Sequence, residues 1–226
     1  MPNWVSNVVN FEGDAEEIER LKATVQSIGE AGDAYDFDFD KIIPTPKGLH
    51  DVVSGGLEDM AREICKKISH DPLGEILEDK MDMLLDKIKW PEWVKDIPKQ
   101  KAMMKQYIKN FKETGYTSWY GWCCDKWGTK WNASDSQFGD NEVDFNTAWS
   151  TPVPVMIQLS KMFPTVLISV SFADEDLGSN CGRYDLQDGS IVDEYIPANA
   201  DEALKYACDV RGEDYNEIVE ERDQDC

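Results

Sequence analysis

The sequence predicts an α+β protein in which an antiparallel sheet with packed helices is interrupted by a helical insertion. Apolar and polar residues alternate over residues 4–12 and 35–40 and again after residue 142, as in half-buried strands. Between them, residues 56–114 show only helical periodicity. The dipeptide Asp188-Gly189 stands between two strand-like runs, which is typical of a two-residue β-hairpin. At 226 residues with 41% hydrophobic side chains, the chain is expected to fold around a sizeable core.

The N-terminal segment is predicted to form a β-α-β unit. Residues 4–12 alternate as a strand. Asp14 and Glu17 then have the spacing of a capping box, and apolar residues at helical spacing continue to Ile28. Aromatic residues alternate with aspartates over residues 35–39. This alternation predicts a second, half-buried strand.

The middle segment is predicted to be helical throughout. Residues 56–114 carry three apolar stripes with a period of three to four residues. Pro72, Pro91 and Pro98 are expected near helix starts, and Gly115 is expected to end the last helix.

The C-terminal half returns to a mixed pattern. A strand is predicted over residues 143–149, followed by a helix capped by Ser150-Thr151-Pro152. Residues 166–172 alternate as a further strand. The hairpin around Asp188-Gly189 and a helix that begins at Asn199 complete the order β-β-α-β-β-β-α.

The charge of the chain changes along its length. Residues 1–55 have a net charge of −7, residues 56–114 of 0 and residues 115–226 of −15. This shift indicates internal modules. We therefore predict four segments. They are a β-α-β unit (1–55), a helical insertion (56–114), an α+β domain (115–212) and an acidic tail with seven carboxylates (213–226). The spacing leaves open whether the first and third segments share one sheet.

Several motifs carry a resemblance to a known family. They are the opening MPNW, a cassette ending in WGTKWNA (127–133), FNTAWSTPVP (145–154) and LSKMFP (159–164). In these motifs the chain resembles the YubB-type family encoded by phages and plasmids. The resemblance covers residues 1–55 and 115–196. It implies a bacterial mobile-element accessory protein with a ferredoxin-like C-terminal domain. The family supplies no agreed activity and no catalytic residues.

The sequence also limits the location of the protein. The apolar runs are far shorter than the ~20 residues of a membrane span. The N-terminus has neither the positive region nor the apolar core of a signal peptide. We therefore expect a cytoplasmic protein without a membrane contact, in which the six cysteines are reduced thiols.

No catalytic, metal or cofactor motif is recognisable. The chain has only two histidines, Cys123 and Cys124 are adjacent rather than spaced as C-x-x-C, and no glycine-rich phosphate loop is present. Asp174, Glu175 and Asp176 crowd one loop, but without the twelve-residue calcium pattern. We expect no metal and no cofactor. An enzyme that uses carboxylate pairs stays open as an alternative.

The acidic composition favours a non-enzymatic protein that binds, and could inhibit, a basic host protein. Carboxylates held on a fold can stand in for phosphates, so a defence nuclease such as a CRISPR effector is a suitable target. The tryptophans of the cassette could anchor such a partner, although dense tryptophans are commonly core residues. The predicted partner-binding residues are Asp174, Glu175, Asp176, Asp185, Asp188, Trp119 and Trp122.

Two alternatives to this hypothesis remain open. Lys101, Lys105 and Lys109 recur at i, i+4 spacing and give one helix a basic face. With Trp127, Trp131 and Tyr184 on a ferredoxin-like sheet, such a face could bind RNA or DNA. The net charge argues against this, because an acidic surface repels phosphates. The simplest alternative is that the lysines are solvated and that the acidity provides solubility alone. The sequence leaves the oligomeric state open.

Overall fold

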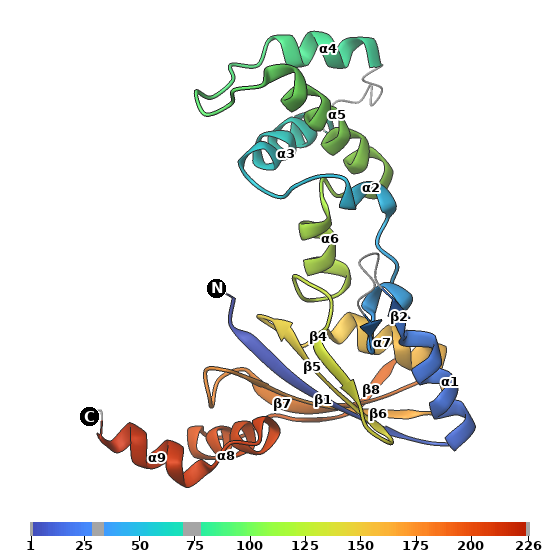
Figure 1. Cartoon of the computed structure of the whole chain (residues 1–226), viewed down its shortest axis with the longest axis vertical. Helices are drawn as coiled ribbons and strands as arrows, with labels where there is room; N and C mark the ends of the chain where they lie inside the picture. Colours follow the sequence, from blue (N-terminus) through green and yellow to red (C-terminus); the bar gives the residue numbers. More distant parts are fainter. Residues whose placement is uncertain (1, 29–33, 70–77, 225–226) are drawn as a thin grey trace. The chain divides into compact units, whose positions relative to one another are not determined.

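The computed structural model describes residues 2–28, 34–69 and 78–224, and it divides into two compact units (Figure 1). The sheet unit consists of Met1–Pro44 with Cys123–Cys226. The helical unit consists of Thr45–Trp122. The helical unit thus extends beyond residues 56–114, the range that the sequence predicted for a helical insertion. The two segments on either side of it form one unit rather than two domains.

The sheet unit is built on one six-stranded antiparallel sheet. Its strands are β1 (Trp4–Glu12), β4 (Ser134–Phe138), β5 (Glu142–Ala148), β6 (Leu167–Asp174), β7 (Cys181–Gln187) and β8 (Ser190–Tyr195). The order across the sheet is β4-β5-β1-β6-β7-β8. In the middle, Val9 of β1 lies opposite Val143 of β5 on one side and Val170 of β6 on the other. The N-terminal strand is thus the centre of the sheet that the C-terminal half forms.

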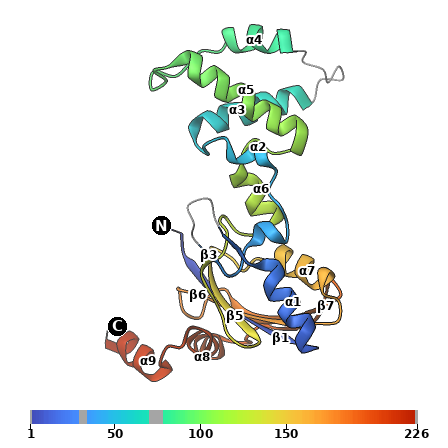
Figure 2. The same ribbon diagram turned by 45° about the vertical axis from the view of Figure 1, so that its right-hand side comes forward.

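The topology confirms the ferredoxin-like α+β fold. Helix α1 (Ala15–Val25) follows β1, and α7 (Val153–Met162) joins β5 to β6. The order β1-α1-β4-β5-α7-β6 is the β-α-β-β-α-β arrangement of that fold. Strands β7 and β8 extend the sheet, and α8 (Ala200–Arg211) and α9 (Tyr215–Gln224) follow. Figure 2 shows α1 and α7 on one face of the sheet and α8 on the other.

The first helix begins where it was predicted and ends early. The Asp14 carboxylate accepts the backbone N-H groups of Glu16 (2.9 Å) and Glu17 (3.4 Å). The helix ends at Val25 rather than Ile28. Ile28 lies instead in β2 (Ser27–Ile28), which pairs with β3 (Ala34–Tyr35), and its side chain is 78% exposed.

The predicted strand over residues 35–39 is wrong. Strand β3 ends at Tyr35, and Phe39–Lys41 form the 3-10 helix η1. This backbone turns Phe37 and Phe39 toward the same core. The Phe37 ring stacks on Phe145 at 5.0 Å, and Phe39 meets Phe145 edge-on at 5.7 Å. A strand would also place both rings on one side, but the backbone N-H groups of Phe37 and Phe39 donate to Ser136 Oγ (3.2 Å) and Asn132 Oδ1 (2.8 Å) rather than to a neighbouring strand.

The helical unit contains α2 (Lys47–His50), α3 (Gly56–Ser69), α4 (Glu78–Asp86), α5 (Ile97–Thr114) and the start of α6 (Trp119–Lys126). Its core is formed mainly by α3 and α5, through residues such as Ala61, Cys65, Met104 and Ile108. Helix α5 is capped by Asp96, has Pro98 in its first turn and ends before Gly115, whose φ of 82° is left-handed. These predictions are confirmed. Pro91 lies in a turn, and Pro72 falls outside the described residues.

The C-terminal region differs from the sequence prediction in two places. Residues Asp188 and Gly189 form the predicted turn with φ of 47° and 72°. The predicted cap of α7 is wrong, because Ser150 Oγ donates to the Gly128 carbonyl rather than capping the helix. The acidic segment that begins at residue 213 is largely the helix α9. Within the described ranges, no helix is long and apolar enough to cross a bilayer.

Candidate functional site

The two units differ completely in charge. The sheet unit has 32 acidic and 10 basic side chains, a net charge of −22, whereas the helical unit has 13 of each. The entire net charge of the protein therefore belongs to the sheet unit. The sequence segments show the same separation, and because the fold joins both flanking segments in one unit, the negative field is concentrated on one module.

The predicted acidic loop lies at the end of β6. Asp174 is buried, and its carboxylate accepts Asn3 Nδ2 (3.2 Å), Asn180 Nδ2 (3.3 Å) and the backbone N-H of Asp176 (2.9 Å). Asp174 therefore organises the loop and does not present a charge to a partner. Its neighbours Glu175 and Asp176 are exposed. The Glu175 N-H donates to the carbonyl of Trp4 at 2.8 Å, which fixes the loop to β1.

Trp149 stands beside this loop, and its role was not recognised in the sequence. It follows β5 with a φ of 72° and its side chain is 43% exposed. Its N-H donates to the Asn3 carbonyl (2.9 Å), and its carbonyl accepts Asn180 Nδ2 (3.2 Å). The two asparagines that bind Asp174 thus also hold Trp149. A left-handed backbone is unfavourable for a bulky residue and persists only where the surroundings fix it.

Two further indoles, Trp131 and Trp4, are connected to Trp149 through Lys130. The Lys130 Nζ is 4.2 Å from the ring centroid of Trp131 and 5.2 Å from that of Trp149. The Trp131 ring is in turn 5.9 Å from that of Trp4. These contacts are within cation-π and aromatic pairing distance. We call the set of Trp4, Lys130, Trp131, Trp149, Glu175 and Asp176 the tryptophan-carboxylate surface.

The last helix enlarges the acidic part of this surface. The Arg222 Nη2 donates to the Leu177 carbonyl at 2.9 Å and so ties α9 to the acidic loop. Between them is an open groove of about 240 Å³. It is lined by Glu175, Asp176, Leu177, Ile218, Glu221 and Arg222. Carboxylates from two elements therefore surround a small apolar floor.

The other predicted partner-binding residues lie elsewhere. Asp185 is on β7 with its side chain 16% exposed, next to Arg183 at 3.4 Å. Asp188 is in the turn at the other end of β7 from the acidic loop. Trp119 and Trp122 belong to the helical unit, where Trp122 is 5% exposed and Trp119 packs edge-on against Tyr120. The structure brings together only Asp174, Glu175 and Asp176 of the predicted set.

Most of the residues named for nucleic-acid binding are either paired with a carboxylate or buried. Lys101 pairs with Asp86, Lys105 with Asp82 (2.6 Å) and Lys109 with Glu113 (4.0 Å). Trp127 and Tyr184 are each 4% exposed. A buried ring has no free face on which a base can stack. Of the aromatic residues named for this alternative, Trp131 alone is partly exposed.

The cysteines of the described chain are mostly buried thiols. Burial raises the pKa of Cys65 to about 11. Burial, together with Cys124 and Asp40, raises the pKa of Cys123 to about 12. These thiols are protonated at neutral pH and are poor nucleophiles. Within residues 2–28, 34–69 and 78–224, no three His, Cys, Asp or Glu side chains come together as a metal site.

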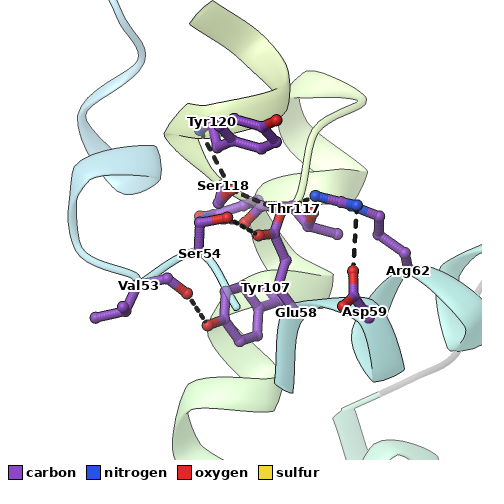
Figure 3. Close-up of polar contacts among 10 residues, drawn as sticks. Val53, Ser54, Glu58, Asp59, Arg62, Tyr107, Thr117, Ser118 and Tyr120 are labelled. Carbon is purple, nitrogen blue, oxygen red and sulfur yellow. Dashed lines mark hydrogen bonds and ion pairs between the residues drawn. The ribbon is translucent and has the colours of Figure 1, made fainter. Parts of the chain in front are cut away.

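A buried carboxylate in the helical unit was also missed. Glu58 on α3 is 1% exposed. Its Oε1 accepts Thr117 Oγ1 (2.8 Å), Ser118 Oγ (2.6 Å) and Arg62 Nη2 (2.8 Å), and its Oε2 accepts Ser54 Oγ (2.7 Å) (Figure 3). The sequence shows only a glutamate in the first turn of a helix, because its partners are up to 60 residues away.

The Glu58 network stabilises the helical unit. Burial by itself would raise the pKa of Glu58, but the hydrogen bonds from Ser118, Ser54, Thr117 and Arg62 outweigh it and lower the pKa. The carboxylate is thus ionised and saturated with donors. It ties the loop before α3 to the segment before α6, and it is not placed to act on a substrate.

A family model agrees with the fold of the C-terminal part of the chain. Residues 126–221 match the family model described as the ferredoxin-like domain in Api92-like protein. Among solved structures, the protein api92 from Yersinia pseudotuberculosis is similar, with 11% identity over 88% of this chain and 99% of that chain and a TM-score of 0.44. No curated protein matches the chain. The C-terminal half thus resembles a ferredoxin-like family for which the description gives no activity.

Proposed function

We propose that this chain is a non-enzymatic binding protein whose sheet unit binds a basic protein through the tryptophan-carboxylate surface. The observation that carries this proposal is Trp149, which is held half-exposed in a left-handed backbone beside Glu175 and Asp176. Tryptophan is enriched among the residues that dominate binding energy. Carboxylates at the rim of such an anchor increase the association rate with a positively charged partner.

The charge of the sheet unit indicates the kind of partner. A net charge of −22 on one module, partly carried by a fixed loop and a helix, can occupy a basic channel that normally binds nucleic acid. We propose a bacterial host protein with such a channel, for example a defence nuclease or CRISPR effector that the chain inhibits. The resemblance to phage- and plasmid-encoded proteins supports this role as a mobile-element accessory protein acting in the host cytoplasm.

Replacing Trp149 with Ala is expected to reduce recovery of the partner at least about tenfold, because a truncated anchor residue typically costs 2 kcal/mol or more. The tagged chain is incubated with nuclease-treated bacterial lysate, and bound proteins are identified by mass spectrometry. The matched control is Trp93→Ala, since Trp93 is a 58% exposed tryptophan of the neutral helical unit. Circular dichroism verifies that both variants fold.

The charge component is tested separately with the double variant Glu175→Gln, Asp176→Asn. Recovery of the partner is expected to fall at low salt and to depend less steeply on salt concentration, because screened attraction is what these carboxylates supply. If Trp149→Ala and Trp93→Ala behave alike, the surface is not the binding site. If no basic protein is recovered at any salt concentration, the proposed function is wrong.

A further inference from the structure

A second groove lies on the face of the sheet opposite α1 and α7. Helix α8 packs on this face against β6, β7 and β1, while β4 and β5 lie to the other side of β1 in the sheet. The groove has a volume of about 370 Å³ and runs between β1, β4, β5 and the C-terminal end of α8. Ser6 and Val8 of β1 form part of its floor.

The groove is electronegative. Asp135, Asp144 and Asp209, which come from three different elements, line it. In the described part of the chain, none of the three forms an ion pair with a lysine or arginine, although Asp135 accepts a hydrogen bond from Ser134 at 3.0 Å. Burial and the nearby Glu142 raise the pKa of Asp144, as expected for a carboxylate without a cation. The C-terminal end of α8, at Gly212, adds the negative end of the helix dipole.

One guanidinium already lies in this groove. The Arg211 Nε donates to Glu213 Oε1 at 2.8 Å, and its Nη1 donates to Ser6 Oγ at 3.1 Å. Ser6 Oγ in turn donates to Asn146 Oδ1 at 3.2 Å. The charge of Arg211 is thus balanced by Glu213, and the three aspartates remain without a positive partner among the described residues.

The arrangement of acceptors selects the kind of cation. The carboxylates are spread along the groove, and the described residues do not converge three ligands on one point. A compact ion therefore cannot reach them together. A guanidinium presents five N-H donors in a planar fork and can bridge separated acceptors, while its alkyl stem packs on an apolar residue such as Val8.

We propose that this groove binds an arginine side chain presented by the basic partner protein. The inference rests on the proposed function, because it names the side chain by which that partner is recognised. It also places a second contact on the sheet unit, separate from the residues of the tryptophan-carboxylate surface. Arginine is favoured over lysine, so the groove contributes specificity as well as attraction.

The test titrates N-acetyl-arginine-amide and N-acetyl-lysine-amide into the isotopically labelled full chain and follows backbone amide signals by NMR. The arginine derivative is expected to shift the signals of Val8 and Asn146 and to bind at least about fivefold more tightly than the lysine derivative. Asp144→Asn and Asp135→Asn are each expected to weaken it about tenfold. Asparagine suits position 135, where φ is 54°.

The control variants separate this inference from the proposed function. Glu194→Gln removes an exposed charge from β8 and is expected to change nothing. Trp149→Ala is expected to leave arginine binding intact. Equal affinity for both derivatives, shifts outside the groove, or unchanged binding in Asp144→Asn would each overturn the inference. If one of these results is obtained while Trp149→Ala still reduces recovery of the partner from lysate, the proposed function stands and only the arginine site is wrong.

Discussion

Replacing Phe145 with Ala is expected to lower the free energy of unfolding of the sheet unit by about 3–5 kcal/mol. The side chain is 2% exposed and lies between two other aromatic rings. It stacks on Phe37 with an interplanar angle of 6° and meets Phe39 at 80°. Removal of the ring creates a cavity and ends both aromatic pairs, each of which contributes about 0.5–1.5 kcal/mol beyond burial. Urea denaturation of the full chain, followed by circular dichroism, measures the change.

The control for Phe145→Ala is Val192→Ala. Val192 lies on the edge strand β8 and is 55% exposed, so its truncation is expected to change the free energy of unfolding by less than about 1 kcal/mol. A loss below about 1 kcal/mol in Phe145→Ala would mean that the aromatic cluster is not the packing centre of this unit.

Replacing Glu58 with Ala is expected to destabilise the helical unit by about 2–4 kcal/mol, because three hydroxyl donors lose their acceptor inside the protein. The cost of losing the ion pair is limited, since the Arg62 side chain is 39% exposed and can return to water. Glu58→Gln keeps one acceptor oxygen and is expected to lose less. Thermal unfolding of both variants is compared with that of Glu63→Ala on the same helix, whose side chain is 63% exposed. Equal effects at positions 58 and 63 would contradict the role of the network.

The Glu58 network also predicts a dependence on pH. Its pKa is lowered in the folded state from the ordinary value of 4.5. The ionised carboxylate therefore contributes stability above pH 4.5, and this contribution is lost as the pH falls through the folded pKa. The difference in unfolding free energy between the wild type and Glu58→Gln is expected to be constant near neutrality and to shrink in acid. A difference that does not change with pH would show that the charge of Glu58 is not responsible.

Local signals in the sequence were sufficient for most elements of the fold. The cap at Asp14, the turn at Asp188-Gly189 and the glycine that ends α5 each depend on a few neighbouring residues. The pairing of β1 with β5 and β6 could not be read in the same way, because strand partners distant in sequence leave no local pattern. The segment around Phe37 was misassigned since its alternation matches a strand, whereas contacts with Phe145 decide its path.

The candidate site was predicted only in part, because it also depends on contacts between residues that are distant in sequence. The run Asp174 to Asp176 is visible in the sequence as a cluster of charges. The burial of Asp174 is not, because it depends on Asn3 and Asn180. Trp149 was read as a continuation of a strand, and the hydrogen bonds that turn its backbone come from those same distant asparagines.

The central position of β1 has a consequence for how the protein is made. Val9 leaves the ribosome first, but its neighbours Val143 and Val170 are translated only after the whole helical unit. At a translation rate of about 5–20 residues/s, β1 is synthesised roughly 10–30 s before its partner strands. The helical unit can complete its own core in that interval. During this interval the N-terminal strand exposes Val5, Val9 and Phe11. It is thus the segment to which a chaperone or an aggregating chain can bind during synthesis.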